Sequence, residues 1–156
     1  MRTPSLRDIL SGIKNKENET VGKYLFTNSP IFHADRVISF LNLENIFEGK
    51  TTKNFVFFCL SQIKIVGTLD FLEMDEFCKP HHQSFQTMFD MVKKNPKYKD
   101  IDPSNCLFFD DSLDNLENGK KFGFSTVYVG GISSKDYVDF SIQDIYKINT
   151  ILPHIF

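Results

Sequence analysis

The part of the sequence between Cys106 and Val129 constrains the fold more than any other. Cys106–Phe109 is an uninterrupted apolar run of the kind found in strands that are buried on both faces. It ends in the polar residues 110–112, and a short helix is expected from about Leu113 to Gly123, which is a natural left-handed cap. The β-branched segment Ser125–Val129 then predicts a second strand. This order predicts two parallel strands joined by a crossover helix.

The same order of strand, polar tip and helix occurs near the N-terminus. Tyr24–Phe26 predicts a short strand that stops at Thr27, Asn28 and Ser29, after which Pro30 is well placed to open a helix. The apolar residues of that helix share one face, and they are Ala34, Val37, Ile38 and Leu41.

Three further helices are expected. Thr3 as a cap and Pro4 as the first helical residue predict a helix at the N-terminus, Pro80 opens another, and the last covers Ile142–Leu152. The inward-facing residues of the first two follow helical spacing and are Leu6, Ile9, Leu10 and Ile13, then Phe85, Met88, Phe89 and Val92.

Strands that alternate with helices at this spacing predict an α/β fold. We expect a Rossmann-like, doubly wound and mainly parallel sheet with helices on both faces, because right-handed crossovers place the helices there. A chain of 156 residues corresponds to one domain, 1–156. Lys50–Gly67 does not fit this order; its β-prone composition allows an extra strand or hairpin, but we interpret it as an insertion.

Composition excludes several classes of function. A net charge of -2 provides no basic field, so we expect no nucleic-acid partner. The longest apolar run, Phe55–Leu60, is far shorter than the ~20 residues of a spanning helix, which argues against a membrane protein. The 3 cysteines include no Cys-x-x-Cys pair, which favours a reducing compartment, the cytoplasm or also the nucleus.

The polar tips of the two predicted strands carry the chemistry. Asp110 and Asp111 are adjacent carboxylates at the end of an apolar strand, where burial without a cation would be costly. Mg²⁺ prefers oxygen ligands and takes one or two carboxylates together with a substrate phosphate, so the pair predicts a magnesium site. The alternative is a helix cap, in which Asp111 or Ser112 satisfies the first amides of the next helix.

Three more residues suit a phosphate. Thr27 and Asn28 offer a hydroxyl and an amide beside a helix start, although these residues taken alone are explained better by a helix capped by Ser29. Lys79 precedes a helix start, where an anionic ligand would explain a cation better than the helix dipole does; an exposed lysine, which costs little there, explains it equally. Ligands of open parallel sheets bind beyond the carboxyl ends of the strands, so these residues are candidates for one site.

The order of these motifs resembles that of haloacid dehalogenase-like (HAD) phosphatases. The matching residues are Leu25-Phe26-Thr27-Asn28, Cys78-Lys79-Pro80 and Phe108-Phe109-Asp110-Asp111-Ser112, with Asn115 and Gly119. Within that superfamily the sequence is most similar to the pyrimidine 5'-nucleotidase branch, over nearly the whole chain except Lys50–Gly67. The resemblance implies that Thr27 bonds the phosphoryl group, Lys79 neutralises charge, and Asp111 binds Mg²⁺ with help from Asp110.

The resemblance also implies a nucleophile that the motifs above do not include. These phosphatases form an aspartyl-phosphate on an Asp-x-Asp motif that follows a first strand, and no such motif lies upstream of Thr27. Asp8 lies inside a helical pattern. We therefore expect a core shortened at its N-terminus, without the nucleophile strand and most of the cap.

Three hypotheses follow. In the first, the chain is a shortened member of a family that hydrolyses phosphomonoesters, nucleoside 5'-monophosphates above all, with Mg²⁺. In the second, it is a non-catalytic module that keeps phosphate or magnesium binding, or only the fold, for regulation or assembly. A receiver-type phosphoacceptor domain ranks last, because the order of its aspartates, threonine and lysine differs. The first hypothesis implies a small phosphorylated substrate, a nucleotide above all, as the partner.

Overall fold

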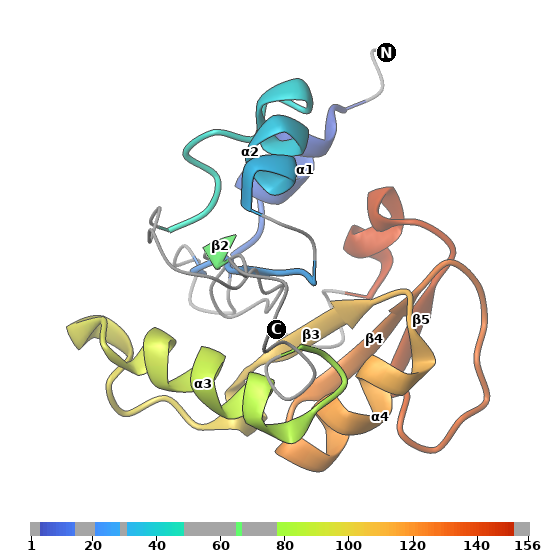
Figure 1. Ribbon diagram of the computed structural model, residues 1–156. Coiled ribbons are helices and arrows are strands. Elements are labelled where there is room, and N and C mark those ends of the chain that lie inside the picture. Colours follow the sequence, from blue (N-terminus) through green and yellow to red (C-terminus); the bar gives the residue numbers. More distant parts are fainter. Residues whose placement is uncertain (1–3, 15–20, 29–30, 49–64, 67–77, 152–156) are drawn as a thin grey trace.

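The computed structural model describes residues 4–14, 21–28, 31–48, 65–66 and 78–151 (Figure 1). Its α-helices are α1 (Leu6–Ser11), α2 (Ile31–Phe40), α3 (His82–Lys93) and α4 (Leu113–Phe122). Its strands are β1 (Leu25–Phe26), β2 (Ile65–Val66), β3 (Leu107–Asp110), β4 (Ser125–Val129) and β5 (Phe140–Ile142). Three 3-10 helices are η1 (Pro96–Tyr98), η2 (Pro103–Asn105) and η3 (Ile145–Thr150).

The strands are parallel and form two sheets. β3, β4 and β5 lie side by side in that order, and Phe109 is opposite Val127 in the register. β1 pairs with β2, where Leu25 is opposite Ile65 and Phe26 is opposite Val66. Since helix α4 connects β3 to β4, these strands form the predicted parallel unit. The prediction of an α/β fold with parallel strands is confirmed.

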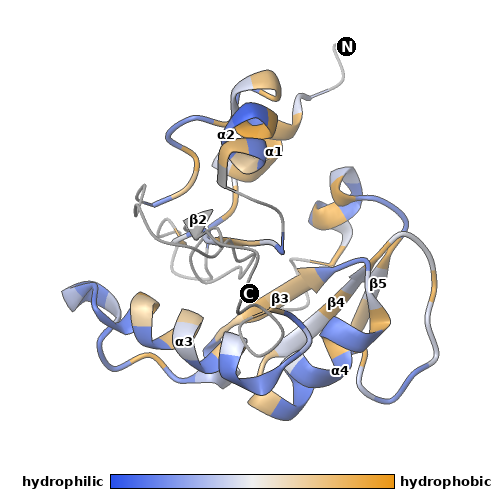
Figure 2. Ribbon diagram, viewed as in Figure 1, coloured by the Kyte–Doolittle hydropathy of each residue, from blue (hydrophilic) through white to orange (hydrophobic). Residues whose placement is uncertain are grey.

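Strand β3 is covered on both faces, which explains its apolar sequence. Leu107 and Phe109 point to one face and pack with residues of α1, α2 and η3. Cys106, just before the strand, and Phe108 point to the other face and pack with α3 and α4. Figure 2 shows most of β3 as hydrophobic and much of α4 as hydrophilic. In the described part of the chain, the core therefore consists of two apolar clusters, one on each face of β3.

Aromatic side chains fill the cluster between β3 and helices α3 and α4. The rings of Phe85 and Phe108 meet edge to face, with centroids 5.5 Å apart and an interplanar angle of 84°. Both are completely buried, as is Phe124. Gly119 of α4 lies against Phe108, because a Cβ added there would come within 2.6 Å of the ring. Helix α4 approaches the sheet this closely because position 119 has no side chain.

Both ends of α4 follow the predicted chemistry. The side chain of Ser112 caps the helix by accepting from the backbone N–H of Asn115 at 3.4 Å. The helix ends at Gly123, whose φ of 111° is the left-handed conformation that glycine adopts without strain. A serine cap and a terminal glycine thus fix where the crossover helix begins and ends.

Two predicted helices differ from the structure. Helix α1 is capped by Ser5 and not by Thr3, because Ser5 and Asp8 bond each other's backbone N–H reciprocally, with distances of 3.2 and 2.9 Å. Ile142, predicted to begin the last helix, instead ends strand β5 and pairs with Val129. The helix that follows is the 3-10 helix η3, and the side chain of Asp144 caps it.

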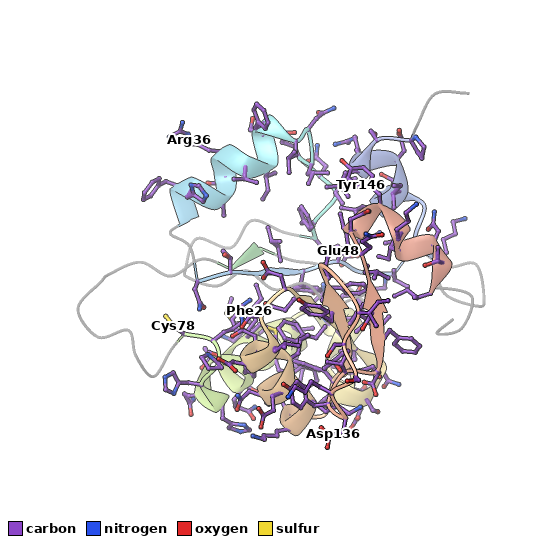
Figure 3. All side chains as sticks on the ribbon, turned by 90° about the vertical axis from the view of Figure 1, so that its right-hand side faces the viewer. Phe26, Arg36, Glu48, Cys78, Asp136 and Tyr146 are labelled. Atoms are coloured by element: carbon purple, nitrogen blue, oxygen red, sulfur yellow. The ribbon has the colours of Figure 1, made fainter. Side chains whose placement is uncertain are left out.

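One predicted apolar face is only half covered. On α2, Ala34 and Ile38 are buried, whereas Val37 is 40% exposed, as is Leu41 directly after the end of the helix. Phe32 and Phe40 are exposed as well. In Figure 3, Arg36 extends from the same helix away from the rest of the molecule. The helix therefore packs along a narrower stripe than the sequence pattern predicts.

The predicted insertion 50–67 lies mostly outside the described residues. Two of its residues, Ile65 and Val66, are described and form β2 beside β1. The polar loop predicted between residues 15 and 20 is also outside the described part. Within that part, none of the helices combines the length and the apolar character that crossing a bilayer requires.

Candidate functional site

The polar tips of β1 and β3 meet at one pocket. The pocket has a volume of about 480 Å³ and lies where these two strands end. Its polar lining comes from Thr27, Asn28, Lys79, Asp110, Asp111 and Asn115, and its apolar lining from Leu25, Phe26, Phe109, Val129 and Ile145. All five residues selected from the sequence, Thr27, Asn28, Lys79, Asp110 and Asp111, are therefore in one place, although they come from three distant segments.

A buried ion pair forms the centre of the pocket. The Nζ atom of Lys79 lies 2.5 Å from Oδ2 of Asp110, and the two side chains are only 8% and 5% exposed. Such a pair keeps two charges out of water, which is tolerated only when their remaining polar groups find partners. The surroundings of each partner therefore decide whether the pair is stable.

Asp110 has a hydrogen bond at each carboxylate oxygen. Oδ2 accepts from Lys79, while Oδ1 accepts from the backbone N–H of Ser112 at 2.9 Å and from Nδ2 of Asn115 at 3.1 Å. The first turn of α4 thus folds back on the end of β3 and holds the carboxylate. Asp110 is a fixed counterion for Lys79 in this arrangement.

Lys79 is held by aromatic rings and by Asn28. Its Nζ atom lies 5.0 Å from the centroid of the Phe26 ring and 5.6 Å from that of Phe108, distances at which a cation is attracted to a ring face. Its backbone exchanges two hydrogen bonds with the Asn28 side chain. The ammonium group therefore has a defined place beside the pocket.

Asp111 is exposed, in contrast to its neighbour. In the described part of the chain, no three side chains of His, Cys, Asp or Glu are grouped to hold a metal ion. The carboxylates that line the pocket are that of Asp111, which is exposed, and that of Asp110, whose oxygens already accept hydrogen bonds; the Thr27 hydroxyl and the side-chain amides of Asn28 and Asn115 line the pocket as well. This set suits Mg²⁺, which keeps several waters and uses few protein carboxylates when a phosphate completes its shell.

Each predicted role of these residues has an alternative explanation, and the structure bears on two of the three alternatives. A cap at the start of α4 is present and its side chain is Ser112, so the cap is not formed by Asp111. Lys79 is not an exposed lysine, since it is buried against Asp110. The proposed Ser29 cap lies outside the described residues.

Asn115, Phe26 and Phe108 belong to the motifs that resemble those of HAD phosphatases, but the sequence predicts no role for them in the site. Asn115 is three residues after the cap Ser112, and this spacing could have indicated a side chain that turns back toward the strand end. Phe26 and Phe108 are each one or two residues before a polar tip, but nothing in an apolar strand indicates which ring faces a cation. The contact of these two rings with the ammonium group depends on where the fold places Lys79.

A second buried polar group lies away from the pocket. Lys23 is 4% exposed, and its Nζ donates to the carbonyl of Val21 at 3.2 Å. Burial lowers the pKa of Lys23, and the charge of Glu48 partly offsets this. The Tyr98 hydroxyl donates to both oxygens of Glu48, at 3.0 and 3.2 Å, and burial together with that carboxylate raises the pKa of Tyr98.

No protein-family model matches this sequence.

Proposed function

We propose that the pocket is the greater part of a magnesium-dependent phosphomonoesterase site of the HAD type. On this proposal the chain has a Rossmann-like, doubly wound HAD core related to the pyrimidine 5'-nucleotidases. Its substrate is a small phosphorylated molecule, a nucleoside 5'-monophosphate above all. The resemblance of the three motifs supports the proposal, and so do the parallel strands.

The grouping of charged and polar side chains in one pocket supports the proposal in addition to the resemblance of the motifs. One pocket at the carboxyl ends of β1 and β3 is lined by a buried lysine, a fixed aspartate, an exposed aspartate and a threonine. Phosphoryl transfer depends on positioned groups that offset the charge of the phosphate oxygens. The pocket has a cation to face those oxygens, a hydroxyl to bond them, and a carboxylate placed to hold a divalent ion.

Each residue has a defined part on this proposal. The Thr27 hydroxyl donates to a phosphate oxygen, and the Lys79 ammonium neutralises negative charge while Asp110 keeps it in place. Asp111 holds Mg²⁺, which supplies further positive charge to the phosphate when it is bound. Leu25 and Phe109 form part of the apolar lining beside these charged groups.

The proposal requires a further carboxylate to attack the phosphorus atom. Of the residues that line the pocket, Asp110 and Asp111 are the acidic ones, and both already have parts. β1 pairs with β2 and β3 pairs with β4, while both β1 and β3 line the pocket. A strand placed between β1 and β3 would deliver the residues at its own carboxyl end to the same pocket.

The test adds such a strand. A fusion that carries an apolar strand ending in Asp-x-Asp should release phosphate from nucleoside monophosphates or p-nitrophenyl phosphate, and only with Mg²⁺. The chain without the fusion should release none, because a covalent intermediate cannot form without the attacking carboxylate. Substituting both aspartates of the added motif by asparagine provides the control. Magnesium-dependent turnover by the unmodified chain, lost in Asp111→Asn, would show that another residue of the chain is the nucleophile and would contradict the need for an added strand.

A non-catalytic module is the second candidate, and the closed ion pair favours it. Asp110 accepts hydrogen bonds at both oxygens, one of them from Lys79, so the two buried charges compensate each other without a substrate. Such a module would bind phosphate with Mg²⁺, and the fusion would also bind it but give no turnover. The same pair of proteins therefore separates the two functions.

A further inference from the structure

The side chain of Asn28 makes a two-point contact with the backbone of Lys79. Its Nδ2 atom donates to the carbonyl oxygen of Lys79 at 2.9 Å, and the N–H of Lys79 donates to Oδ1 of Asn28 at 3.0 Å. The two residues are 51 positions apart in the sequence. Their contact joins the tip of β1 to the segment that precedes α3.

We infer that Asn28 is a positioning residue that sets the place of the Lys79 ammonium group. The inference rests on the proposed function, in which that ammonium faces a phosphate. An amide with one donor and one acceptor engaged by the same peptide unit fixes both the distance and the direction of that backbone. The Lys79 side chain then leaves its backbone toward Phe26, Phe108 and Asp110.

Each member of the buried ion pair is thus held by an asparagine. Asn115 and the backbone of Ser112 fix the carboxylate of Asp110. Asn28 acts on the other member, since it fixes the backbone of Lys79. Because the side chain of Lys79 has several rotatable bonds, a fixed backbone is needed to keep the ammonium at one point of the pocket.

The sequence suggests a different role for Asn28, that of a phosphate ligand. The two roles differ in what Asn28→Ala changes. A ligand would affect phosphate binding alone, whereas a positioning residue also affects Lys79 when no phosphate is present. The experiment therefore measures Lys79 directly.

The test compares Asn28→Ala with Asn118→Ala. Asn118 is a matched control because its Nδ2 also donates to a backbone carbonyl, that of Asp114, at 3.0 Å and outside the pocket. Two quantities are measured without phosphate: hydrogen exchange of the Lys79 backbone N–H by NMR, and acetylation of its Nζ by mass spectrometry. Lys120, which pairs with Asp139, is the internal reference for acetylation.

In Asn28→Ala we expect the Lys79 N–H to exchange about fivefold faster or more, as the loss of one hydrogen bond implies, and Lys79 to be acetylated faster relative to Lys120. Asn118→Ala should change neither. Asn28→Asp keeps the acceptor for the Lys79 N–H and should give intermediate values. Unchanged exchange and acetylation of Lys79 in Asn28→Ala would overturn the inference.

Two further outcomes are decisive. If Asn28→Ala does not fold, Asn28→Asp replaces it, and native acetylation of Lys79 in that variant overturns the inference. Inorganic phosphate with Mg²⁺ should slow acetylation of Lys79 in the native chain but less in Asn28→Ala. If phosphate gives no protection in the native chain, the proposed function fails, while the measurements without phosphate still decide the role of Asn28.

Discussion

Lys79 and Asp110 are the two residues on which the candidate site depends most. Their charges lie 2.5 Å apart in a place that water hardly reaches. Removing one partner of a buried pair leaves the other charge uncompensated, which costs more than the pair itself contributes. The stability of the chain should therefore report on this pair.

The first prediction concerns Lys79→Met. We expect the free energy of unfolding to fall by about 3–5 kcal/mol, because Asp110 would remain buried without its cation. Lys120→Met, which removes the partner of the half-exposed Asp139, should cost at most about 1 kcal/mol. Denaturant unfolding measures both. If the double variant Lys79→Met/Asp110→Asn recovers none of the loss, the uncompensated charge is not its cause.

Tyr98 provides a prediction of pH dependence. Its pKa is raised above the usual 10.0, first by burial and then by the Glu48 carboxylate. Above pH 10 the unfolded chain loses this proton while the folded chain keeps it, so the stability falls as the pH rises further. Tyr98→Phe should remove this alkaline loss, as measured by unfolding at a series of pH values. The exposed Tyr146 is the control, and an equal effect of Tyr146→Phe would contradict the explanation.

Among the elements, β3 and α4 are the ones that the sequence predicts best. Their boundaries depend on local signals that lie within a few residues: an apolar run, a serine cap and a glycine that takes a left-handed conformation. The sequence predicts neither strand β5 nor the exposure of Val37 on α2. Ile142 becomes a strand residue because Val129 is its neighbour, and Val37 is exposed because no described element covers it; neither fact is local in the sequence.

Packing between α4 and β3 gives the third prediction. A methyl group at Gly119 would lie 2.6 Å from the Phe108 ring, which is itself completely buried and cannot move freely. Gly119→Ala should therefore destabilise the chain by about 1–3 kcal/mol in thermal or denaturant unfolding. Gly131→Ala is the control, since its added Cβ would be at an ordinary 3.5 Å from Tyr128. Equal effects of the two substitutions would show that the close contact is not what matters.

At the scale of the whole molecule, the sequence predicts the position of the site but not its internal contacts. The rule that ligands bind at the carboxyl ends of parallel strands brings Thr27 and Asp110 to one pocket. The contacts from Asn28 to Lys79 and from Asn115 to Asp110 depend on the relative placement of β1, α3 and α4 to within an ångström. The spacing of residues in the sequence does not determine these contacts.

The fourth prediction concerns residues 50–67, which we interpret as an insertion. Deleting 50–64 keeps β2, so it should leave the soluble yield unchanged or raise it. Deleting 50–67 also removes Ile65 and Val66, which pair with β1, and should lower the unfolding midpoint. Identical behaviour of the two deletions, with full yield, would show that this pairing contributes nothing and that the whole segment is an insertion.

The proposed function depends on whether the pocket binds phosphate together with Mg²⁺. Calorimetric titration of inorganic phosphate into the native chain should give saturable heat with Mg²⁺ present and little without it. Asp111→Asn should weaken this binding by about tenfold or more, since it removes the exposed carboxylate assigned to the metal. Asp136→Asn, at an exposed aspartate outside the pocket, should bind as the native chain does. The same heat from native and Asp111→Asn protein, or none from either, would contradict the assignment of this pocket to a phosphate and its magnesium ion.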